Sequence, residues 1–280
     1  MKNLAVVFVA FALCSLSLAV TPTAPKIDKQ KEAAAAAAQK NAAGEQVGRN
    51  ATSTCSFTFT SGASNTYLQY CVTVNGNITQ LMTPLGHEHI AVGAFGEGYG
   101  ICDASTLVNY DDYADFGDTG NWAAPVTTHP NPTTVKVVRS TSDAIWTLTQ
   151  TITQVAASSS VKIAMTLKNN TAISRRGFLV RYADIDADST LLNNFDATVN
   201  SSFGNNSRGF GLMLQIVGTP VTTIGFGSIT QNVPNGPAPC NIFANEAENT
   251  TGVDGSAVVL FDNIYTAHAM KTYTVQYKGI

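Results

Sequence analysis

The strongest constraint in this sequence is a two-residue alternation of apolar and polar side chains that recurs along the chain. Over residues 146–153, Trp146, Leu148 and Ile152 alternate with threonines. Successive side chains of a strand point to opposite faces, so this pattern is typical of a half-buried β-strand. Threonine suits the exposed face because its branched Cβ packs well on a pleated surface. The same alternation at 57–60, 68–74, 161–168 and 273–277 predicts many strands.

Turn-forming residues separate these alternating runs. Asn75-Gly76, Asn169-Asn170 and the small polar segment 157–160 each lie between two of them, and Asn and Gly favour tight turns. A 3.6-residue apolar period occurs in the body of the chain only weakly, near residues 244–248, so we expect the strands to be mostly uninterrupted by helices. The sequence therefore predicts an all-β fold, a large antiparallel β-sandwich of two packed sheets. A closed barrel and a propeller are the alternatives, and the lack of a fixed repeat counts against a propeller.

The beginning of the chain differs from the rest in composition. Residues 1–19 combine Lys2, an apolar run and a small residue, Ala19, at the expected cleavage position, which predicts a signal peptide. An uncleaved anchor is the alternative, although the apolar run is short for a membrane span. Residues 20–51 are rich in Ala, Lys and Gln, which predicts a flexible or partly helical tether. We expect residues 52–280 to form a single β-sandwich domain, secreted, periplasmic or at the cell surface, with no later membrane span.

The cysteines agree with export. Cys14 lies within the predicted signal peptide, which leaves four: Cys55, Cys71, Cys102 and Cys240. An even number in an exported chain favours two disulfides, for which three pairings exist. We favour Cys55–Cys71, which could join the arms of a hairpin, and Cys102–Cys240, which would close a long loop.

The net charge of −3 conceals an uneven distribution. No Lys or Arg occurs between Arg49 and Lys136, whereas that interval contains seven carboxylates: Glu88, Glu97, Asp103, Asp111, Asp112, Asp115 and Asp118. Such groups repel one another unless they are solvated, paired across the fold or bound to a cation. The pattern argues against nucleic acid and anionic membranes as partners, and it mildly favours a divalent cation.

The first candidate site is His87-Glu88-His89. On a strand both imidazoles point to the same side and could bind one transition metal, with His129 or His268 as a third ligand. The alternative is a strand end whose polar side chains bond to a neighbouring loop.

The second candidate is an interleaving of acidic and aromatic residues in a stretch that reads as a loop. Aromatic faces stack on sugar rings and carboxylates accept hydroxyl hydrogens, so this composition predicts a carbohydrate site. The alternatives are a calcium loop and an acidic loop that packs by its own aromatic rings. The expected ligand-binding residues are Tyr110, Asp112, Tyr113, Asp115 and Trp122.

The third candidate follows the apolar run 178–180. If the strand continues, Asp184, Asp186 and Asp188 share one face and would repel one another unless they hold a cation. The spacing also resembles the start of a calcium loop, although it does not match an EF-hand. We expect these three residues to be metal ligands, with calcium as the ion. The alternative is a sheet edge kept soluble by charge.

These features favour an extracellular, non-catalytic binding or surface protein, with carbohydrate as a candidate ligand. The first alternative is a carbohydrate-active enzyme with a carboxylate pair drawn from Glu88, Glu97, Asp184 and Asp186. The second is a histidine-based metalloprotein.

Overall fold

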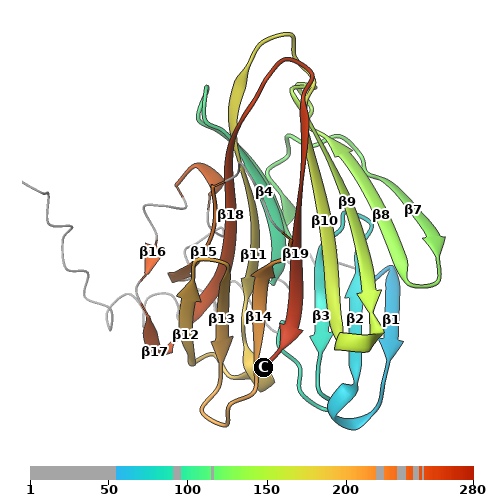
Figure 1. Ribbon diagram of the computed structural model, residues 1–280, viewed down its shortest axis with the longest axis vertical. Coiled ribbons are helices and arrows are strands. Elements are labelled where there is room, and N and C mark those ends of the chain that lie inside the picture. Colours follow the sequence, from blue (N-terminus) through green and yellow to red (C-terminus); the bar gives the residue numbers. More distant parts are fainter. Residues whose placement is uncertain are drawn as a thin grey trace, which may run out of the picture.

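The computed structural model describes residues 55–90, 96–114, 117–218, 224–231, 238–241, 246–247 and 249–280. The predicted signal peptide and tether, and Asp115, lie outside these residues. The described chain is built almost entirely of antiparallel strands in two large sheets and one small one, shown in Figure 1. The predicted all-β sandwich is therefore confirmed, with an additional small sheet. No helix among the described residues is long and apolar enough to cross a membrane.

The larger sheet has nine strands, in the spatial order β17-β12-β13-β14-β19-β10-β9-β8-β7. Its middle contains the runs whose alternation was most regular, and Ile163 lies opposite Ile152 on one side and Val275 on the other. These side chains are buried, and the intervening threonines and lysines face outward. The strands are β7 (Val126–Asn131), β8 (Thr134–Ser140), β9 (Trp146–Val155), β10 (Ser160–Asn169), β12 (Asn193–Thr198), β13 (Ser201–Asn205), β14 (Gly211–Ile216), β17 (Thr250–Val253) and β19 (Met270–Gly279).

The second sheet has seven strands, in the order β16-β15-β18-β11-β4-β5-β6. Its central strands β11 and β4 are buried along almost their whole length, because both faces of the sheet are covered. On one face Ile101, Leu179 and Val259 join the core shared with the nine-stranded sheet. The strands are β4 (Glu97–Asp103), β5 (Val108–Tyr113), β6 (Gly117–Asp118), β11 (Arg175–Asp184), β15 (Ile224–Gln231), β16 (Glu246–Ala247) and β18 (Gly255–Tyr265).

The third sheet consists of β1 (Phe57–Ser61), β2 (Leu68–Val72) and β3 (Ile78–Met82). Leu68, Tyr70 and Leu81 extend the same core, and the sheet lies next to β7–β9 (Figure 1). The described structure also contains short 3₁₀ helices at η1 (Ser64–Thr66), η2 (Ala156–Ser158), η3 (Ala187–Ser189) and residues 239–241.

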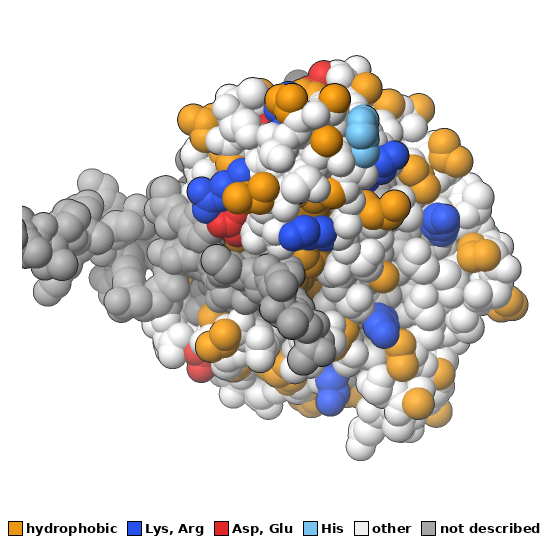
Figure 2. All heavy atoms as spheres, turned by 45° about the horizontal axis from the view of Figure 1, so that its top comes forward, with side chains coloured by type: hydrophobic (Ala, Val, Ile, Leu, Met, Phe, Trp, Pro, Cys, Tyr) orange, Lys and Arg blue, Asp and Glu red, His pale blue; other side chains and the backbone are white. Residues whose placement is uncertain are grey.

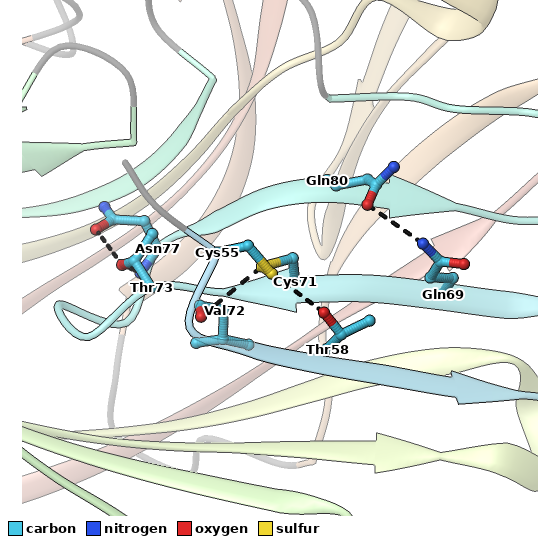
Figure 3. Close-up of a disulfide and its surroundings, with 8 residues drawn as sticks. All are labelled: Cys55, Thr58, Gln69, Cys71, Val72, Thr73, Asn77 and Gln80. Carbon is cyan, nitrogen blue, oxygen red and sulfur yellow. Dashed lines mark hydrogen bonds between the residues drawn. A yellow bond between two sulfur atoms is a disulfide. The ribbon is translucent and has the colours of Figure 1, made fainter. Parts of the chain in front are cut away.

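Both disulfides have the predicted pairing. Cys55–Cys71 ties the residues before β1 to β2, with 5.5 Å between the Cα atoms (Figure 3). Cys102–Cys240 joins β4 to a segment 138 residues later. Next to that bridge, Gly100 is required by packing: a Cβ atom at this position would lie 2.3 Å from Cγ of Pro239. Gly98 is required in the same way, because a Cβ atom there would lie 2.2 Å from the Asp112 main-chain oxygen.

Candidate functional site

The carboxylates of the acidic interval are largely paired across the fold, one of the three outcomes that the sequence left open. Their partners are arginines from later strands, so the sequence gap without Lys or Arg does not correspond to a gap in space. Breaking such a buried pair on one side is strongly destabilising. The pairs are Asp103–Arg175 (2.6 Å), Asp118–Arg139 (2.7 Å), Asp112–Arg139 and Glu97–Arg181.

The acidic and aromatic stretch begins in a strand rather than in a loop, because Tyr110 to Tyr113 lie in β5, which pairs with β4 over its full length. The strand therefore divides the expected ligand-binding residues between its two faces. Tyr110 joins the core and donates a hydrogen bond to Asp143 (2.5 Å), whereas Tyr113 belongs to a second apolar cluster on the other face. Asp115 lies outside the described residues.

Asp112 and Trp122, the other two expected ligand-binding residues, surround Arg139. The guanidinium group pairs with Asp112 and lies 5.0 Å from the centre of the Trp122 ring. The Trp122 indole donates to the main-chain oxygen of Asp111 (3.1 Å). These contacts give both residues a packing role in the described structure.

The outer face of the seven-stranded sheet carries two buried tyrosines near the third candidate site. The Tyr113 and Tyr182 rings meet edge to face, with their centres 5.2 Å apart. Ser256 on β18 donates a hydrogen bond to the Tyr182 hydroxyl (2.6 Å). Burial raises the pKa of Tyr182 well above its usual value, and the charges of Asp184 and Asp254 raise it further.

Two of the three expected metal ligands lie together, joined by a carboxylate that the sequence did not single out. Asp184 ends β11 opposite Ser256, so Asp186 and Asp254 continue the two strands side by side. Asp184, Asp186 and Asp254 are buried, and each offers an oxygen within 4.8 Å of the others. Three neighbouring carboxylates can together hold a divalent cation. Two of them could instead act as the acid and base of a glycosidase.

Asp188 turns away from this cluster and pairs with the first candidate site. The chain leaves the strand after Asp184, and Asp188 and Ser189 both have positive φ angles, 56° and 60°. Such backbone strain in residues other than glycine is concentrated at functional sites. As a result the Asp188 Oδ1 atom lies 2.8 Å from Nδ1 of His87.

Asp188 is held by two further groups. Asn206 donates to its Oδ2 atom (2.8 Å), and the exposed Arg208 donates to the same atom (2.5 Å). Burial opposes the charge on this carboxylate, but the hydrogen bonds from His87 and Asn206 hold its pKa below the usual value. An ionised carboxylate on Nδ1 orients the imidazole and leaves Nε2 directed elsewhere, as in acid–base dyads.

The His87 ring stacks on Phe210, with ring centres 3.6 Å apart. Phe210 also lines a surface hollow of about 530 Å³ between the turns β9–β10 and β13–β14 and the end of β19. Hollows of this size fit small ligands. The other lining residues are Asn65, Thr83, Pro84, Ala157, Ser158, Ser159, Lys278, Gly279 and Ile280.

Each of the remaining histidines lies apart from this pair. His89 is buried and its Nε2 atom lies 2.7 Å from the Thr83 oxygen, and burial lowers its pKa. His129 packs against Phe57 and Phe59, and His268 lies in the turn between β18 and β19. In the part of the chain that the structure describes, the cluster suited to a metal ion contains aspartates alone.

Sequence reasoning flagged His87 and Asp188 separately but missed Asn206, Arg208, Phe210 and Asp254. The first and third candidate sites meet through the main chain, since the Asp188 N–H donates to the Glu88 oxygen (2.7 Å) and the Asp186 N–H to the His89 oxygen (3.0 Å). No local pattern marks the missed residues, because single polar or aromatic residues in turns are common. Only the strand order brings them to this end of the sandwich.

No protein family and no curated protein matches the sequence. The fold, in contrast, resembles solved structures. A bacterial glucoamylase bound to acarbose aligns with a TM-score of 0.55 and 9% identity over 81% of this chain, which spans about a third of the glucoamylase (32%). A putative aldose 1-epimerase from Escherichia coli gives a TM-score of 0.46 and 6% identity, covering 80% of this chain and 99% of the epimerase.

Heparan sulfate lyase HepC from Pedobacter heparinus gives a TM-score of 0.44 and 12% identity, covering 81% of this chain and 35% of the lyase. Of these three, the glucoamylase match alone has a TM-score above 0.5, and at 9% identity it shows a shared fold and nothing finer. The chain is thus a β-sandwich of the architecture found in the glucoamylase.

Proposed function

We propose that this protein binds carbohydrate outside the cell, with the ligand in the hollow beside Phe210. The observation that carries the proposal is the lining of the hollow, which combines one aromatic ring with hydroxyl, amide and ammonium groups. Sugar rings stack on aromatic faces, and their hydroxyls need a few convergent polar partners. The fold shared with a glucoamylase is consistent with this ligand class.

The extracellular location is supported by the two disulfides. Disulfides persist in oxidising compartments and are rare in the cytosol. Residues 1–19, which resemble a signal peptide, point the same way.

The test is a glycan-binding screen followed by titration of the best ligand into wild type and a Phe210→Ala variant. Loss of one stacking ring should weaken binding roughly tenfold, equivalent to about 1.4 kcal/mol. Phe203→Ala is the matched control, because Phe203 is a half-exposed phenylalanine of β13 that does not line the hollow. Equal affinities for both variants would refute this site.

A carbohydrate-active enzyme is the second candidate, and one observation favours it. The oxygens of Asp184, Asp186 and Asp254 lie within 4.8 Å of one another, and most glycosidases act with two neighbouring carboxyl groups. This candidate predicts turnover of glycosides in the same screen and its loss in Asp186→Asn. If the wild type binds glycans without hydrolysing them, the protein is a binding protein and the enzyme candidate is wrong.

Calcium stays a proposal for the same cluster, supported by three buried carboxylates that end neighbouring strands. A cation bound only by the native state raises the melting temperature, and the stabilisation grows with the logarithm of its concentration relative to its dissociation constant. We therefore expect added calcium to raise the melting temperature, EDTA to lower it, and Asp254→Asn to remove both effects. Identical melts in calcium and EDTA would exclude the ion.

A further inference from the structure

The outer face of β8, β9, β10 and β19, four strands of the nine-stranded sheet, is cationic. Lys136 on β8 and Lys162 and Lys168 on β10 are exposed there, while the apolar residues between them point to the core. The four strands β8, β9, β10 and β19 contain no Asp or Glu. The whole protein is nevertheless acidic, with a net charge of −3, so this positive face is a local property.

The register shows that these lysines have uncharged neighbours. Lys136 lies opposite Thr151, and Lys162 lies opposite Thr153 and Gln276. Lys168 lies opposite Thr147 and Met270. Among the described residues none of the three lysines forms an ion pair. Their charges therefore remain available to a partner.

Hydroxyl groups fill the space between the lysines. Thr147, Thr149, Thr151 and Thr153 form a row along β9, and Thr166 and Thr272 bond to each other across β10 and β19 (2.7 Å). Lys and Arg side chains are scattered among uncharged ones over the lower right of Figure 2, where no Asp or Glu is visible. The face thus offers positive charges set among hydrogen-bonding groups.

The spacing of the charges indicates a polymer as the partner. Lys162 and Lys168 are six residues apart on one strand, roughly 20 Å at about 3.4 Å per residue. That separation exceeds the screening length of about 8 Å at physiological salt, so one small anion cannot engage both. An extended polyanion can.

We propose that this lysine–threonine face binds an anionic polysaccharide, carrying sulfate or carboxylate groups. Positive potential attracts such a chain, and the threonine hydroxyls can bond to its sugar hydroxyls. A lipid surface fits less well, because membrane-bound faces insert large apolar side chains. In these four strands, all fully described, Met270 at the start of β19 is the only large apolar side chain that is strongly exposed.

The test compares dextran sulfate with uncharged dextran, which has the same sugar backbone, at 0.15 M salt as a chosen condition. The full chain should bind dextran sulfate and not dextran. The triple variant K136Q/K162Q/K168Q should bind at least about tenfold more weakly, because steering by a charged face contributes factors of 10 to 10³. Arg176→Gln is the control: it removes one exposed positive charge from the other sheet and should change affinity less than Lys162→Gln does.

Three results would overturn the proposal: undiminished binding by the triple variant, an equal loss in Arg176→Gln and Lys162→Gln, or tighter binding to phosphatidylserine vesicles that the triple substitution abolishes. Circular dichroism melts check that the variants are folded. Phe210→Ala should leave dextran sulfate binding intact, so the proposal for the lysine–threonine face and the proposal for the hollow are tested independently.

Discussion

Arg181 provides the sharpest test of the energetics, because its charge is completely buried between the two large sheets. It pairs with Glu97 and donates to the Gln150 side chain (2.5 Å) and to the Gly76 main-chain oxygen (3.2 Å). Glu97 also accepts hydrogen bonds from the Ile78 main chain (2.7 Å) and the Tyr277 hydroxyl (2.8 Å). One ion pair thus links strands of all three sheets.

The perturbation is Arg181→Met, which keeps the length of the side chain and removes the charge. At pH 8 the variant must either bury the Glu97 carboxylate without its cation or protonate it, and we expect a loss of about 3–5 kcal/mol in the free energy of unfolding. At about 2–4 °C per kcal/mol for a chain of this size, the melting temperature should fall by roughly 10 °C.

The loss should depend on pH in a defined direction. Burial raises the pKa of Glu97 from 4.5 to about 7, and the charge of Arg181 opposes that rise. Without Arg181 the folded-state pKa moves higher still, so the native state binds a proton that the unfolded state releases. Stability then falls as pH rises from about 4.5 toward that pKa, and the variant should lose less at pH 5 than at pH 8.

Urea unfolding at the two pH values measures the effect. The double variant E97Q/R181M should recover much of the loss at pH 8, because the neutral amide keeps an oxygen for Ile78 and an NH₂ group that can donate to the Tyr277 oxygen. Arg176→Met, which removes an exposed ion pair with Asp262, should cost less than about 1 kcal/mol. Equal losses for Arg181→Met at pH 5 and pH 8 would refute the reasoning.

Two further predictions follow from buried features of the seven-stranded sheet. Burial, together with the charges of Asp112 and Asp118, raises the pKa of Asp111 from 3.8 to about 7, so stability should fall by a few kcal/mol as pH rises between these values. Urea unfolding of Asp111→Asn should show a flatter pH dependence, and an unchanged slope would contradict the assignment. The double variant C102A/C240A opens a link across 138 residues and should lower the free energy of unfolding by about 2–5 kcal/mol. Thermal melts of this variant check it, and a melting temperature equal to that of the wild type would contradict it.

The strands were predictable because alternation is local. The runs around Leu148, Ile163 and Val275 each specify which side chains are buried, and all three lie in adjacent strands of one sheet with that face in the core. The order of the strands was not predictable, since nothing near β10 identifies the distant β19 as its partner. The small three-stranded sheet was missed for the same reason.

The site residues were harder to predict, because the chemistry depends on groups that are distant in sequence. The acidic interval looked uncompensated, yet Asp112 and Arg139 are 27 residues apart and Asp103 and Arg175 are 72 apart. The expectation that Asp184, Asp186 and Asp188 share one face of a strand placed the first two together. It failed for Asp188, because the strand ends at Asp184 and Asp188 has a positive φ angle.

The lysine–threonine face depends on the order of the strands as well as on the sequence pattern. The alternation of apolar and polar residues places Lys162 and Lys168 on the polar side of their strand. It cannot show that Lys136 joins them, since that depends on β8 lying two strands from β10 in the sheet. Nor can it show that the carboxylates of the chain lie elsewhere, because Glu97, Asp112 and Asp184 become buried only when the second sheet forms. The sheet order therefore separates the charges, with paired acids inside the sandwich and unpaired lysines on its outer face.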